Sequence, residues 1–288
     1  MNNTLLLDQI PEVPFTDWFN TGVNWLTDNL AGFFDAIVLV LETIMNFVTN
    51  IFLIIPPEIF IIVLVVVAFF AAKKSFGLPA FVLVGMIYIY NQGLWESMLN
   101  TLTLVLFASA IAIIIGVPLG IWSAKSDGAD SIISPILDFL QTMPSFVYLI
   151  PAVAFFGIGM VPGVFAAVIY AIAPTVRQTN LGIRSIDTEL IEAAESFGST
   201  GSQKLRKVEM PLAMPNIMAG INQTVMLTLS MVVIASMIGA PGLGDQVVLA
   251  LQRADFGPGF VAGIAIVILA ITLDRLIQTF GRSERDSA

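Results

Sequence analysis

The chain has 288 residues, of which 57% are hydrophobic and only 11% are charged, and its mean hydropathy is +0.91. A soluble domain carries about 25% charged residues, so this composition indicates an all-α fold class, a polytopic helical membrane protein. The chain has no Cys and no His, which excludes disulfides, thiol chemistry and imidazole catalysis and predicts no metal site. Its net charge of −9 argues against nucleic acid as a partner.

Residues 1–57 contain several acids but no Lys or Arg. Their polar residues fall on two helical stripes, the first made of Asp17, Asn20, Asn24 and Asp28 and the second of Asp35, Glu42, Asn46 and Thr49. Such stripes are costly against lipid, so we predict two amphipathic helices that lie in the membrane interface. The alternative is one true span over Phe33–Ile55, with its polar side packed inside the protein.

Seven apolar segments after this region predict membrane spans. They are Glu58–Ala72, Leu78–Tyr90, Met98–Ala124, Ile132–Phe156, Val161–Gln178, Pro211–Ile238 and Gly257–Phe280. The first two are shorter than the ~20 residues that a span usually needs, and we expect them to form an accessory region over residues 58–94. Residues 95–280 would then be the main membrane domain, and residues 281–288 a tail.

The basic residues orient these spans. Eleven of the 12 Lys and Arg fall on one side of the predicted membrane, and only Arg253 falls on the other. By the positive-inside rule the side with most of the charge is the cytoplasm. We therefore expect the N-terminus outside the cell and the C-terminus inside it.

Residues 192–211 form the most polar and most basic stretch between two apolar spans, and the whole segment 187–211 predicts a small helical hairpin there. Asp187 is a suitable N-cap for a first helix, and Gly198 fits the left-handed position that ends one. Thr200 and Gln203 have the spacing of a capping box, which would begin a second helix. Pro211 marks the return to the membrane.

This 187–211 loop resembles the EAA loop of ABC importer permeases. The pattern is carried by Glu192, Ala193, Ala194, Gly198, Val208, Met210 and Pro211, with Val208 and Met210 where the family has Ile and Leu. Residues 142–163 and 211–244 are similar to the osmoprotectant subfamily, the glycine betaine and proline betaine permeases. The resemblance extends over roughly Trp95–Gln278.

The resemblance implies the fold and the partners. The fold would be the transmembrane fold of a type I ABC importer, preceded by the N-terminal amphipathic helices. Two copies would form a homodimer in the bacterial cytoplasmic membrane, with two cytoplasmic ATPase subunits and an extracellular substrate-binding protein. ATP and Mg would be bound by the ATPase, and this chain would hold no cofactor. The residues expected to couple it to the ATPase are Glu192, Ala193, Ala194, Phe197, Gly198 and Pro211.

Three features within the spans are candidates for a solute path. Pro144 would bend the fourth span, which then either gates the path or only packs. Asn216, Gln223 and Ser230 are spaced by seven, and such a polar stripe either joins helices or lines water. Phe146 and Tyr148 offer aromatic faces of the kind that bind quaternary ammonium, although aromatic residues at such positions are more often in the core or against lipid.

Motifs for ATP hydrolysis are absent, because Gln203 and Leu205 flank Lys204 where a P-loop would need Gly and Ser or Thr. We therefore expect no enzyme but the permease subunit of an ATP-driven importer of glycine betaine or a similar osmoprotectant. An alternative is a secondary transporter or channel without an ATPase, which would need ionisable groups in mid-membrane. A membrane scaffold that acts through its N-terminal helices is a third possibility.

Overall fold

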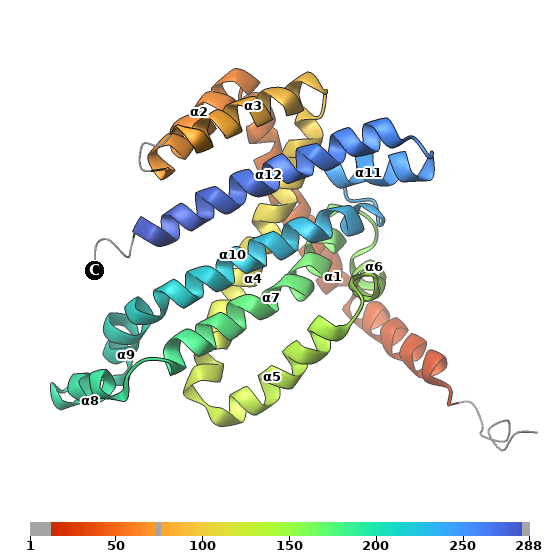
Figure 1. The fold of residues 1–288 in the computed structure, drawn as a ribbon. Coiled ribbons are helices and arrows are strands. Elements are labelled where there is room, and N and C mark those ends of the chain that lie inside the picture. The colour runs from red at the N-terminus through yellow and green to blue at the C-terminus, as the bar shows by residue number, and fades with distance from the viewer. Residues whose placement is uncertain (1–12, 73–75, 284–288) are drawn as a thin grey trace, which may run out of the picture.

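The structure is a computed structural model that describes residues 13–72 and 76–283, and these residues are helical throughout apart from short connections (Figure 1). The helices are α1 (Phe15–Ile54), α2 (Pro57–Ala71), α3 (Gly77–Asn91), α4 (Trp95–Lys125), α5 (Asp127–Thr142), η2 (Ser145–Tyr148), α6 (Leu149–Phe156), α7 (Met160–Arg184), α8 (Thr188–Ser196), α9 (Gly201–Lys204), η3 (Leu205–Glu209), α10 (Met210–Ser236), α11 (Leu243–Gln252) and α12 (Phe256–Ser283). The predicted all-α class is therefore confirmed.

Five of the described helices are long and apolar enough to cross a membrane, or six if a bent pair counts as one span. Four of them, α4, α7, α10 and α12, coincide with predicted spans. The accessory helices α2 and α3 have 15 residues each. At about 1.5 Å per residue each is near 22 Å long, shorter than the ~30 Å hydrocarbon layer.

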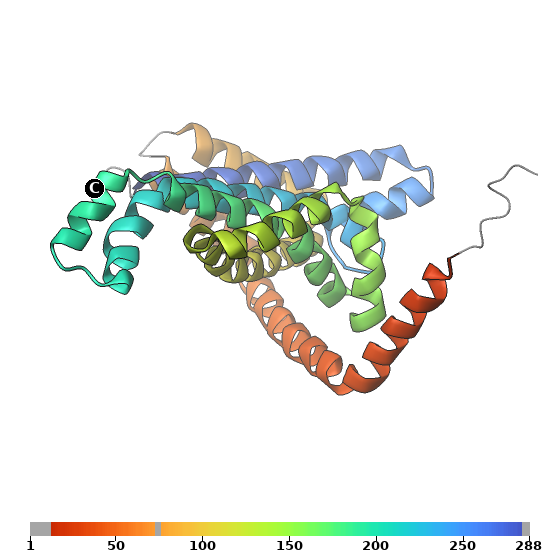
Figure 2. The same ribbon diagram turned by 90° about the horizontal axis from the view of Figure 1, so that it is seen from below.

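The N-terminal region differs from the prediction of two helices. It is one helix of 40 residues, α1, whose two straight arms meet at a sharp bend (Figure 2). The chain has no proline between Pro14 and Pro56, so every residue there keeps the backbone N–H that a helix needs. The second half packs on α4, where Thr49 donates a 2.8 Å hydrogen bond to Thr103. The helix is also one of the five that meet the length and polarity required of a span.

The centre of the molecule is formed by α4, α7 and α10, with α7 packed against both of the others (Figure 1). Small residues let the backbones come close. A Cβ at Gly120 of α4 would lie 2.6 Å from the Val176 carbonyl of α7, and one at Gly220 of α10 would lie 2.9 Å from the Pro174 carbonyl. Threonines bond across the contacts, as in Thr175 and Thr224, whose hydroxyls are 2.7 Å apart.

The fourth predicted span, Ile132–Phe156, is not one continuous helix. It is broken into α5 and the segment Ser145–Phe156, which meet at 110°. Met143 is extended, with φ −70° and ψ 137°, because the residue before a proline is pushed out of the helical region. Pro144 therefore breaks this span into two arms, where the sequence had predicted a bend.

The remaining helices surround this centre. The pair α2 and α3 packs on α12, and α11 lies between α10 and α12. Both views place α8 and α9 at one end of the molecule and α6 and α11 at the other (Figures 1 and 2).

Candidate functional site

The 187–211 loop is a helical hairpin that projects from one end of the bundle (Figures 1 and 2). Its first helix is α8, which begins after Asp187 as predicted, although the Asp187 side chain makes no capping hydrogen bond. No residue of α8 is buried. The hairpin is therefore fixed by its turn, by an ion pair and by its attachment to the membrane helices.

The turn after α8 confirms the prediction for Gly198, whose φ is +77°. The Ser199 amide donates to the Ala194 carbonyl (3.1 Å) and the Gly198 amide to the Glu195 carbonyl (2.9 Å). These two bonds define a Schellman motif, which needs a left-handed residue at this point. A Cβ at Gly198 would meet no atom within 4 Å, so the requirement for glycine comes from the backbone conformation alone.

The second arm begins with the predicted capping box. The Gln203 amide donates to the Thr200 hydroxyl at 3.4 Å, and the Thr200 amide donates to the Gln203 side chain at 2.9 Å. Lys204 then forms an ion pair with Glu195 of α8. The hydrogen bond and the charge of Lys204 lower the pKa of the Glu195 carboxyl. The pair ties the two arms together at neutral pH.

The exposed surface of α8 carries the residues that the sequence singled out. Glu192 and Ala193 are exposed and Ala194 is half-buried. Phe197 is 92% exposed and Leu190 47%. Apolar side chains so exposed at the tip of a projecting hairpin are typical of a surface that binds another protein.

The base of the hairpin is held by a buried carboxylate that the sequence reasoning missed. Glu209 is only 2% exposed and pairs with Lys125 at the end of α4. It ends a five-residue π-helix, η3, and Pro211 follows in the first turn of α10. In the sequence, one acid between a basic run and a proline was the only available signal. The ion pair attaches the hairpin to α4, in addition to the chain connections that join it to α7 and α10.

A second polar cluster joins the ends of α4, α5 and α7 beside this pair. Arg184 donates to the Ser123 carbonyl at 3.0 Å and to the Asp127 carboxylate at 2.8 Å. Asn180 donates to the Ser123 hydroxyl at 2.6 Å and to Asp130 at 2.7 Å. The cluster fixes the end of α7 from which the hairpin leaves, and its members come from three helices, so no local pattern predicted it.

The polar stripe of α10 does not join helices. Gln223 and Ser230 are exposed, Asn216 is half-buried, and the Ser230 hydroxyl bonds only to the Met226 carbonyl of its own helix (3.1 Å). The bonds that join α10 to its neighbours come from elsewhere, for example from Thr228 to Ser109 of α4 (2.8 Å). Because polar side chains facing lipid are costly, the stripe favours a surface that meets water or another subunit.

The other candidate path residues lie at the broken span. Pro144 is exposed at the turn after α5, and Phe146 is 54% exposed. Tyr148 is 2% exposed, and its ring packs edge-on against Tyr170 of α7 at 6.0 Å. The short helix η2 that carries Phe146 and Tyr148 contacts both α7 and α10. The broken span therefore packs against α10, the helix that carries the polar stripe, and against α7.

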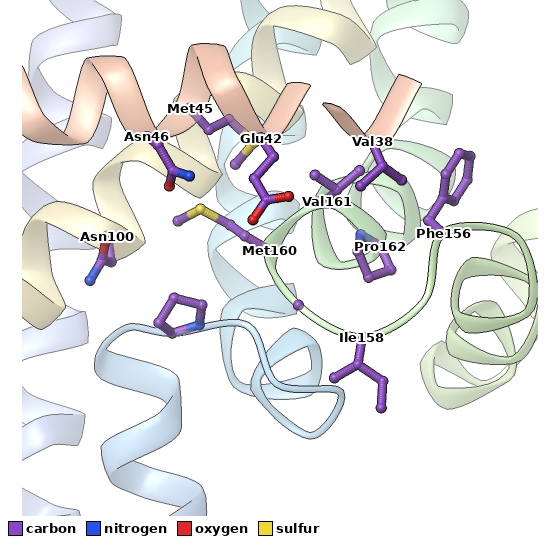
Figure 3. Close-up of a pocket in the computed structure, with 12 residues that line it drawn as sticks. Val38, Glu42, Met45, Asn46, Asn100, Phe156, Ile158, Met160, Val161 and Pro162 are labelled. Atoms are coloured by element: carbon purple, nitrogen blue, oxygen red, sulfur yellow. The ribbon is translucent and has the colours of Figure 1, made fainter. Parts of the chain in front are cut away.

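A separate cavity of about 210 Å³ lies between α1, the start of α4 and the loop that joins α6 to α7. Figure 3 shows Glu42 and Asn46 projecting into it from α1, with Asn100 from α4 and Met160 across from them. None of these residues was predicted as a site. Part of the second polar stripe of α1 therefore faces this cavity and the polar side chain of Asn100 instead of lipid.

Comparisons with known proteins agree on one family. The family described as binding-protein-dependent transport system inner membrane component matches residues 116–286. The glycine betaine/carnitine transport permease of Listeria monocytogenes is 56% identical over 97% of this chain and 99% of its own length. The glycine betaine/proline betaine permease of Escherichia coli is 46% identical over 95% of this chain and 77% of its own.

A similar solved structure supports the fold. An inward-facing conformation of the MetNI methionine ABC transporter matches with a TM-score of 0.57 at 24% identity. The match covers 70% of this chain and 98% of that one.

Proposed function

Since the chain belongs to the family of binding-protein-dependent transport system inner membrane components, we propose that it imports glycine betaine or a similar quaternary-ammonium osmoprotectant. The identity of 56% over nearly the whole length of a glycine betaine/carnitine permease carries this proposal. The chain is the membrane component of an ABC transporter and not its ATPase. It is a multi-pass membrane protein whose partners are an ATPase and a binding protein.

The test is reconstitution. The chain, its ATPase and its binding protein are placed in proteoliposomes with ATP inside and radiolabelled glycine betaine outside. ATP-dependent uptake supports the proposal. Uptake of a sugar or a metal ion without uptake of any betaine would contradict it.

The 187–211 loop is the proposed contact with the ATPase. Its exposed helix α8 offers Leu190, Ala193 and Phe197 to a groove, and small residues at 193 and 194 permit close approach. In this proposal the ATPase binds ATP and Mg, and the loop only transmits the movement of the ATPase to the membrane helices. Fixation of the hairpin by Glu209 and Lys125 means that a displacement of α8 is carried into α4 and α10.

Two copies of the chain would face each other across the exposed side of α7 and α10, with the solute passing between them unchanged. The exposed amide of Gln223 and hydroxyl of Ser230 support this, because a path for a zwitterion needs polar groups. The test is a bifunctional thiol reagent on a Gln223→Cys variant, which is specific because the chain has no other Cys. A cross-link between copies is expected, and its absence with full labelling would contradict the arrangement.

The orientation completes the proposal. The end that carries α8 and α9 lies in the cytoplasm, together with the end of α12, and the end that carries α6 and α11 faces outward to the binding protein. The excess of Lys and Arg at the first end supports this orientation.

A further inference from the structure

One ion pair joins α5 to α7 outside the 187–211 loop. Arg177 of α7 pairs with Asp138 of α5. Both side chains are accessible, at 43% and 67%. The pair therefore lies on an open surface, about two helical turns before the end of α7 and one turn before the end of α5.

The position of this pair around α7 follows from the neighbouring contacts. Thr179 faces α4, since a Cβ at Gly120 would lie 2.6 Å from its Cβ. Arg177 is two positions away, about 200° round the helix, so it faces away from α4. In α10, Thr228 bonds Ser109 of α4, and Gln223 lies about 140° from it. Arg177 and Gln223 therefore occupy the same side of the α7–α10 pair.

The position along the helices is fixed in the same way. Gly182 of α7 lies beside Asn216 of α10, and Gln178 lies beside Gly220. Since α7 and α10 run in opposite directions here, Arg177 is level with a point between Asn216 and Gln223. Arg177 therefore lies beside the polar stripe of α10, at a level between Asn216 and Gln223. It is about two helical turns from Arg184, where α7 ends on the side proposed to be cytoplasmic.

We propose that Asp138 and Arg177 form a charge-selective site near the inner end of the solute path, where they distinguish a zwitterion from a simple cation. This inference rests on the proposed function. A solute that carries both a carboxylate and a quaternary ammonium presents one partner for each member of the pair. The Arg177 guanidinium binds carboxylates through two parallel hydrogen bonds, and the Asp138 carboxylate attracts the ammonium.

The pair suits this task because its two charges compensate each other when the path is empty. A zwitterion exchanges one neutral arrangement for another, so no charge is left without a partner. A cation such as choline satisfies Asp138 but leaves Arg177 without its partner and is repelled by the Arg177 charge.

The experiment compares two solutes in proteoliposomes that contain the whole complex. Radiolabelled glycine betaine and choline are offered with one binding protein that captures both, and the choline-to-glycine-betaine uptake ratio of each variant is divided by that of the wild type. For Arg177→Gln we expect this relative ratio to rise about tenfold, the value of one hydrogen bond to a charged group. For Asp138→Asn it should fall. The maximal rate should change while KM, which the binding protein sets, stays constant.

Two variants control for a structural role. Asp127→Asn removes a carboxylate of the same helix that also pairs with an arginine of α7, and its relative ratio should stay at one. Arg177→Lys keeps the charge but loses the planar fork, so its ratio should lie between those of the wild type and Arg177→Gln. If Arg177→Gln and Asp138→Asn slow both solutes equally, the pair only holds α5 on α7 and the inference is wrong. A wild-type complex that moves no glycine betaine would overturn the proposed function, and the inference with it.

Discussion

The conformation of Gly198 allows a direct test of the proposed contact with the ATPase. Its φ of +77° lies in the left-handed region, which costs a residue with a side chain ~1–2 kcal/mol. The side chain itself would meet nothing within 4 Å, so the cost is conformational only. Because α8 has no buried residue, no packing of its own opposes a change in the turn. A penalty of this size lowers the ratio of the native turn to other conformations by a factor of about 5 to 30, which is the upper limit of the expected loss.

The measurement is made on Gly198→Val in proteoliposomes of the whole complex. Co-purification of the ATPase, solute-stimulated ATP hydrolysis and uptake should all fall by about the same factor, while the amount of the chain in the membrane stays constant. Binding-protein docking should survive, since it would occur on the opposite side of the bilayer.

Two variants at nearby positions decide whether the backbone is the cause. Gly201→Ala is the matched control, because Gly201 lies in open space at the start of α9 with no positive φ, and alanine favours a helix there. Gly198→Asn should retain most activity, since asparagine tolerates the left-handed region. If Gly198→Val transports as well as Gly201→Ala, the angle of α8 does not matter and the reasoning fails.

Three further predictions concern the same end of the molecule. Lys125→Met should destabilise the chain by roughly 2–3 kcal/mol, somewhat less than the loss of a fully buried pair, because Lys125 is half-exposed. Adding Glu209→Met should recover most of this loss, as measured by thermal unfolding in detergent. An unchanged Tm for the single variant would contradict this. The ion pair that lowers the pKa of Glu195 stabilises the hairpin above the ordinary pKa of a glutamate, and this stabilisation is lost as pH falls through the lowered pKa. Solute-stimulated ATP hydrolysis by Glu195→Gln, divided by that of the wild type, should therefore stay constant from about pH 8 to 6. A ratio that changes in this range would refute the reasoning. A Cys at Ser202 should react with an impermeant maleimide only after the cells are opened, and labelling of intact cells would reverse the proposed orientation.

Features with a local cause were predictable from the sequence. The glycine at the turn and the Thr200–Gln203 capping box depend on residues within a few positions of one another, and both are present as predicted. Family membership was readable for a similar reason, since the residues of the 187–211 loop form one continuous pattern. The polar stripe of α10 was also visible, although the sequence left open whether it joined helices.

Features made by distant residues were not predictable. The 110° break of the fourth span depends on how η2 packs against α7 and α10, and the proline alone indicated only a bend. Arg177 and Asp138 are 39 positions apart, and no local pattern in the sequence joins them. The single helix α1 was missed because a change in the direction of polarity was interpreted as an interruption of the backbone.

The glycine contacts between α4, α7 and α10 limit how this permease can alternate. At Gly120 and Gly220 the neighbouring backbone occupies the place of a side chain, so two helices that slid past each other by one residue would bring Cβ atoms into that space. The three helices should therefore turn as one rigid body when the ATPase closes. In the proposed dimer the path would then open and close at the surface between two such bodies and at the two arms that meet at Pro144.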